Sequence, residues 1–143
     1  MKKIHVIGGG LAGPEAALQA AKQGSQVDLY CLIAELEQGC HYTPAGFALY
    51  FHNYSTWRGH AGIHIEDLYV KPEYRGKGIG KALLPRVAAI AFSEGCTRLQ
   101  WDVLEWNTPP IGFYEQMGAQ MLMDWRTMRV TGEALPTLAV QDK

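Results

Sequence analysis

A glycine-rich segment, Arg75-Gly76-Lys77-Gly78-Ile79-Gly80, is the feature that most constrains what this chain can fold into. It follows an apolar stretch at residues 63–70 with the alternation of a strand. It opens a stretch at 78–93 whose apolar side chains recur at helical spacing. In such a turn, successive backbone N–H groups form a nest for an anion, and the helix adds its N-terminal N–H groups and dipole. Since no Gly-Lys-Ser/Thr follows, the segment is not a Walker loop. The sequence therefore predicts a pyrophosphate cradle, with an ordinary glycine-rich turn as the alternative.

The remaining pattern predicts an α/β or α+β fold, in which helices pack on one sheet. Apolar and aromatic stretches predict strands at residues 4–7, 27–36, 46–51, 63–70 and 97–104, with one or two more within 121–130. Helices are expected at 11–23, 78–93 and from Pro109 or Pro110 to 117, and turns at 8–10, 39–44 and 71–77. The polar stretch 52–62 predicts a hairpin or an excursion, and a change of phase at Glu66-Asp67 indicates a bulge. The tail after Gly132 is expected to be loosely structured.

Composition excludes several classes of protein. A length of 143 residues suits a single domain. The net charge of −1 provides no basic surface for nucleic acid, and no apolar run reaches the length of a membrane span. Three unpatterned cysteines (Cys31, Cys40 and Cys96) indicate neither a disulfide framework nor zinc spacing, and they favour the reducing cytoplasm. The five histidines show no helical i, i+4 pairing, so no metal site is expected.

Several segments together resemble the GNAT acetyltransferases. Leu68-Tyr69-Val70, followed by residues 74–80, is similar to the motif that binds the pyrophosphate of acetyl-CoA in that family. The resemblance narrows to the diamine (spermidine/spermine or thialysine) N-acetyltransferase branch through segments in family order at 51–57, 65–70, 105–107 and 113–119. It covers residues 31–139 and implies a GNAT-like mixed, largely antiparallel sheet with flanking helices. It also implies acetyl-CoA as cosubstrate, a primary amine of a small polyamine or lysine-like molecule as acceptor, and a homodimer.

The same resemblance implies roles for individual residues. Tyr114 would act as the acid near the sulfur, and Glu66 would assist deprotonation of the amine. The backbones of Leu68 and Val70 would pair with the pantetheine arm, and Asn107 would contact the cofactor near the thioester. The pyrophosphate would lie against Arg75, Gly76, Lys77, Gly78, Ile79 and Gly80, and the cationic acceptor against Trp57, Glu35, Asp67 and Trp125. A packing or surface role is the alternative for the named side chains. Pro85, inside the helix after the cradle, is expected to kink it.

The first 30 residues resemble a different family, the folate-dependent tRNA-methylating flavoproteins. Gly8, Gly10 and Gly13 form the G-x-G-x-x-G of a dinucleotide-binding turn, but Cys31 stands where an acidic residue should bind ribose. We therefore expect a fusion in which a Rossmann-type strand-helix-strand precedes the acetyltransferase core. Three functions stay open: an acetyltransferase whose turnover the replaced start impairs, a catalytically inactive chimera that keeps the fold, and a nucleotide-binding module at Gly8–Gly13.

Overall fold

The structure is a computed structural model that describes residues 4–9 and 28–141, and the predicted helix at 11–23 lies outside these residues. The chain divides into two compact units, Met1–Asp102 and Val103–Lys143, each described here by itself. The single-domain organisation stays a prediction from the sequence.

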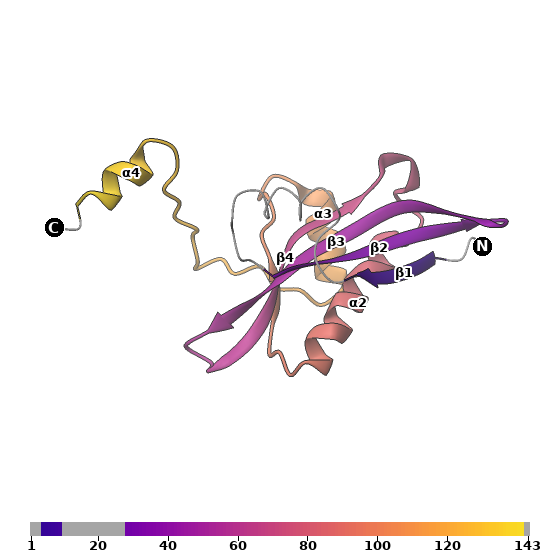
Figure 1. Cartoon of the computed structure of the whole chain (residues 1–143), viewed down its shortest axis with the longest axis horizontal. Coiled ribbons are helices and arrows are strands. Elements are labelled where there is room, and N and C mark those ends of the chain that lie inside the picture. Colours follow the sequence, from indigo (N-terminus) through magenta and orange to yellow (C-terminus); the bar gives the residue numbers. More distant parts are fainter. Residues whose placement is uncertain (1–3, 10–27, 142–143) are drawn as a thin grey trace. The chain divides into compact units, whose positions relative to one another are not determined.

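The first unit is built on a five-stranded sheet in the order β1-β2-β3-β4-β5. The strands are β1 (Ile4–Gly9), β2 (Leu29–Gln38), β3 (His41–Ser55), β4 (His60–Val70) and β5 (Leu99–Trp101). Strands β1 to β4 pair antiparallel in chain order, and β5 pairs parallel to β4. Figure 1 shows β3 and β4 as long neighbouring strands that meet in a hairpin. The predicted mixed, largely antiparallel sheet is thus confirmed.

A helix covers one face of this sheet and closes the core. Helix α2 (Ile79–Ser93) contacts β1, β2, β3 and β4, and it runs without interruption through Pro85. Its buried side chains recur at helical spacing, as the sequence predicts, and the facing strands contribute alternate residues. The buried residues include Ile79, Leu83, Leu84, Val87 and Ala91 from α2, Cys31, Leu32, Ala34 and Leu36 from β2, Ala45, Ala48 and Tyr50 from β3, and Ile63 and Ile65 from β4.

Close packing fixes the position of α2 over the sheet at one glycine. A Cβ built on Gly46 of β3 would lie 2.6 Å from the Tyr69 carbonyl oxygen and 3.2 Å from Cγ2 of Ile79. Only a residue without a side chain allows the first turn of α2 to lie this close to β3 and β4. Gly46 therefore sets the height of the glycine-rich turn above the sheet.

The structure confirms the hairpin and the bulge that the sequence indicates. Strand β3 turns into β4 at residues 56–59, where the Gly59 N–H donates to the Ser55 carbonyl at 2.7 Å. The register of β3 and β4 shifts between Leu49 and Tyr50, which pair with Asp67 and Ile65. Glu66 is thus the extra residue of a β-bulge in β4.

Several element boundaries differ from the prediction. β1 continues through Gly9, so Gly8 and Gly9 lie in a strand and not in the expected turn at 8–10. β3 begins at His41, which shortens the expected turn at 39–44. β5 covers only Leu99–Trp101, because its parallel pairing with β4 ends at Ile65, directly before the bulge. The strands expected within 121–130 are absent, since those described residues adopt turn and irregular conformations. The tail contains one short helix, α4 (Ala134–Ala139).

The first strand does not support a Rossmann-type start. β1 runs antiparallel to β2, with Ile4 opposite Leu36 and Gly9 opposite Cys31. A β-α-β unit with a single helical crossover pairs its strands in parallel. The expected Rossmann-type strand-helix-strand is therefore wrong in the direction of its strands, because β1 and β2 are antiparallel. Gly8 itself pairs with Leu32 within the sheet, whereas a dinucleotide-binding turn needs it outside the strand.

Candidate functional site

The glycine-rich turn has the conformation of an anion nest. Gly76 and Gly78 adopt the left-handed region, with φ of +72° and +83°. Gly78 is the N-cap of α2 and no side chain caps the helix, so its first N–H groups keep their capacity to bind an anion. Nothing lies within 4 Å of a Cβ built on Gly76, which leaves space above the turn. The turn therefore fits a phosphate group through its backbone.

The two basic side chains of the turn are held by the protein's own backbone. Arg75 Nε donates to the Val70 carbonyl at 3.0 Å, and Lys77 Nζ donates to the Glu73 carbonyl at 2.8 Å. Lys77 Nζ also lies 5.1 Å from the centre of the Tyr74 ring. Both side chains are exposed and add positive charge beside the turn, which directly follows η1 (Pro72–Tyr74).

Two of the predicted cradle residues offer only their backbone to an anion. The Ile79 side chain is buried in the core, so only its backbone N–H can bind an anion. Gly80 follows within the first turn of α2. Pro85 lies one turn further on, and α2 continues through it, so the expected kink does not end the helix.

Beyond its bulge, β4 presents an open edge. Among the described residues, no strand pairs with residues 66–70 on the side of β5. The Lys71 N–H donates to the Ala45 carbonyl of β3 at 2.9 Å. Along a strand, the peptide groups of successive residues point to opposite sides. The peptide groups of Leu68 and Val70 consequently point toward the open edge. This edge leads directly into the glycine-rich turn, so an extended ligand can pair with β4 and place a phosphate in the nest.

Glu66 lies at the start of this edge beside a histidine that the sequence analysis did not select. His64 Nε2 lies 4.0 Å from Glu66 Oε2, and Gln100 Nε2 lies 3.4 Å from His64 Nδ1. When the Gln100 amide donates to Nδ1, the ring proton resides on Nε2, which faces Glu66. Glu66 is exposed, whereas the His64 side chain is 14% exposed. Gln100 could not be linked to His64 from the sequence, because their contact depends on the pairing of β5 with β4.

The second unit holds Tyr114 and Asn107. Tyr114 lies in α3 (Thr108–Gln116), with its ring 5.2 Å from that of Phe113. Burial raises the pKa of the Tyr114 hydroxyl above its ordinary value, because it disfavours the charged phenolate. Asn107 is the N-cap of α3, yet its side chain makes no capping hydrogen bond. The roles of both residues toward the cofactor stay predictions from the resemblance.

The four predicted acceptor residues occupy different elements. Trp57 is 94% exposed in the β3–β4 turn, and Trp125 is an exposed residue of the second unit. Glu35 pairs with His5 and Pro44 in the sheet, and Asp67 is exposed beside the bulge. Within the first unit, Asp67 is thus the acidic residue of this set that lies next to Glu66.

None of the helices in the described part of the chain is long and apolar enough to cross a bilayer.

Comparisons with known proteins place the chain in a family. A model described as the acetyltransferase (GNAT) family matches residues 12–119. The chain is 42% identical over 132 residues to a thialysine N-epsilon-acetyltransferase of Bos taurus, covering 87% of this chain and 77% of that protein. It is 34% identical over 119 residues to spermidine/spermine N(1)-acetyltransferase-like protein 1 of Homo sapiens, covering 79% of this chain and 17% of that protein.

The fold has a solved counterpart. An integron cassette protein from the mobile metagenome of V. cholerae superposes with a TM-score of 0.78 at 23% identity, covering 95% of this chain and 97% of that one. The matched family segment spans the open edge of β4, the glycine-rich turn and α3. From its sequence and its fold, the chain belongs to the GNAT acetyltransferase family.

Proposed function

We propose that this chain transfers the acetyl group of acetyl-CoA to a primary amine of a small polyamine or lysine-like molecule. Members of its family use acetyl-CoA. The observation that carries the proposal is the edge of β4 at residues 66–70, which no described strand pairs with on the side of β5 and which leads into the anion nest at Gly76 and Gly78. An extended pantetheine arm would pair with Leu68 and Val70, and the pyrophosphate would bind the N–H groups at the start of α2.

The residues of the chain would handle the two protons of the transfer. The amine nitrogen bonds to the carbonyl carbon of the thioester while the bond from carbon to sulfur breaks. Tyr114 would give its hydroxyl proton to the departing thiolate, since a phenol carries its proton at neutral pH. Glu66 would accept a proton from the amine, directly or through water, and Asn107 would hold the cofactor near the thioester.

The relatives and the local charge support the proposed acceptor class. The names of the two relatives refer to thialysine and to spermidine or spermine, which all carry primary amines. In this chain, exposed Glu66 and Asp67 give the start of the open edge a negative charge that suits a cationic acceptor. Within the first unit, Trp57 would offer a cation–π contact and Glu35 a negative charge to such an acceptor.

A calorimetric titration with acetyl-CoA tests the cradle, with Gly78→Glu as the variant. The full chain should bind saturably, and the added carboxylate should abolish binding because it repels the pyrophosphate at the helix N-terminus. An acetylation assay over thialysine, lysine, spermidine and spermine then tests turnover. Binding without turnover of any of these amines would favour the inactive chimera, and no binding by the unmodified chain would reject the proposed cofactor.

A further inference from the structure

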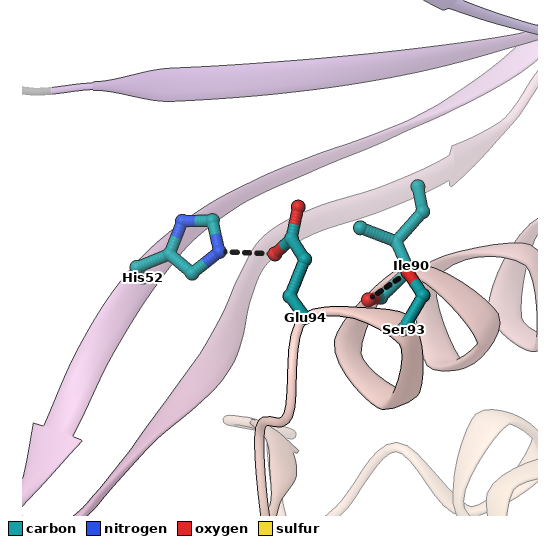
Figure 2. A network of polar contacts seen from close by, with 4 residues as sticks. All are labelled: His52, Ile90, Ser93 and Glu94. Carbon is teal, nitrogen blue, oxygen red and sulfur yellow. Dashed lines mark hydrogen bonds and ion pairs between the residues drawn. The ribbon is translucent and has the colours of Figure 1, made fainter.

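Three metal-ligating side chains meet at the C-terminal end of α2. His52 comes from β3, Glu94 is the C-cap of α2, and Cys96 follows in the connection to β5. One imidazole nitrogen, one carboxylate oxygen and the thiol sulfur all lie within 4.8 Å of one another. His52 Nε2 and Glu94 Oε2 are 2.6 Å apart, a contact that bridges strand and helix end in Figure 2. The donors therefore converge although 42 residues separate His52 from Glu94.

Neighbouring groups fix the directions of these three residues. The Tyr30 ring packs edge-on against the His52 ring, with centroids 5.3 Å apart and planes at 84°. The Glu94 N–H donates to the Ile90 carbonyl at 3.0 Å, and the Cys96 N–H donates to the Ala91 carbonyl at 2.9 Å. The strand and the helix end thus hold all three backbones in place.

The chemistry of the donors selects a zinc-like cation. Zinc takes imidazole, carboxylate and thiolate ligands at about 2.0–2.3 Å, so a tetrahedral ion separates its ligand atoms by about 3.5 Å. The observed separations need only small side-chain adjustments to reach this value. A thiolate is a poor ligand for Mg²⁺ or Ca²⁺, and the negative end of a helix dipole favours a cation.

We propose that His52, Glu94 and Cys96 bind one Zn²⁺ ion, with water as the fourth ligand. The ion would insert between His52 and Glu94 in place of their direct contact, and the thiol proton of Cys96 would pass to solvent. The His52 and Glu94 side chains are 35% and 46% exposed, so the ion and its water can enter. The site lies at the opposite end of α2 from the glycine-rich turn, about 20 Å along the helix axis. It would tie β3 to the connection between α2 and β5, independently of acetyl transfer.

The test is a competition titration of the metal-free, reduced full chain with Zn²⁺ against a chromophoric chelator. The unmodified chain should bind one equivalent. The variants Cys96→Ser, His52→Gln and Glu94→Gln should each lose at least about tenfold in affinity, which corresponds to about 1.4 kcal/mol. Cys40→Ser and His60→Gln are the matched controls, because Cys40 and His60 are exposed and lie outside the cluster. Both controls should bind as the unmodified chain does.

Co²⁺ gives a second readout that identifies the sulfur. Its complex with the unmodified chain should show the visible bands of a tetrahedral ion and a thiolate-to-metal charge-transfer band. Cys96→Ser should lose the charge-transfer band while keeping the circular dichroism of the folded chain. The proposal is overturned by an absence of saturable binding, by equal affinity in the cluster variants and the unmodified chain, or by loss of the charge-transfer band in Cys40→Ser instead.

Discussion

Replacing Gly76 with alanine separates the strain of a turn from the loss of a binding site. Gly76 has φ of +72°, and nothing lies within 4 Å of an added Cβ. Gly39, in the turn between β2 and β3, has φ of +64° and equally open surroundings. Gly39→Ala is therefore a matched control, because both substitutions force an L-residue into the left-handed region and neither creates a clash within the protein.

The structure sets the size of the expected effects. Each alanine should cost about 1–2 kcal/mol in the free energy of unfolding. For a chain of 143 residues, this lowers Tm by about 3–7 °C. Only Gly76→Ala puts a methyl group into the space above the nest, so only this variant should lose at least about tenfold in acetyl-CoA affinity.

Differential scanning fluorimetry and calorimetric titration with acetyl-CoA measure the two effects on the same samples. The expected pattern is a similar decrease of Tm in both variants and a loss of affinity in Gly76→Ala alone. If Gly76→Ala binds acetyl-CoA as tightly as Gly39→Ala, the glycine-rich turn does not bind the pyrophosphate and the reasoning from its backbone is wrong.

Three further substitutions test packing, catalysis and pH dependence. Gly46→Ala should lower the free energy of unfolding by about 1–3 kcal/mol in urea melts, because its Cβ would meet the Tyr69 carbonyl at 2.6 Å; an unchanged midpoint would show that α2 can shift. Tyr114→Phe should lower kcat by about 10²–10⁴ while leaving acetyl-CoA affinity unchanged, and a retained kcat would assign the proton to another group. Burial, Glu94, Tyr30 and Cys31 raise the pKa of Tyr50, so the folded chain keeps this proton after the unfolded chain has lost it. Stability should therefore fall as pH rises above about 10, the ordinary tyrosine value, and Tyr50→Phe should lessen that fall in alkaline urea melts.

Local pattern was sufficient to predict the central strand-turn-helix. The helical spacing of apolar residues after Gly78 and the change of phase at Glu66 both follow from short-range geometry. The turn was recognisable from its glycines, because glycine adopts the positive φ angles of such a turn without a steric penalty. The hairpin turn at residues 56–59 was also predictable, because its polar composition is typical of a turn.

Pairing between distant segments could not be predicted in the same way. The length of β5 depends on where β4 bulges, and the direction of β1 depends on which strand of the sheet it pairs with. Residues within 121–130 have the composition of a strand, but they adopt none in the structure. Propensity is a weak guide wherever hydrogen bonds to another strand decide the outcome.

The sequence by itself determined the glycine-rich turn and the amphipathic face of α2, because each is encoded within a few neighbouring residues. It also determined the family of the chain, through a match that extends over residues 12–119. Only the tertiary structure decided that β1 runs antiparallel to β2, that His64 lies beside Gln100, and that His52 and Cys96 meet at Glu94. Those arrangements join residues far apart in the chain, and their geometry depends on the register of a sheet and on the end of a packed helix.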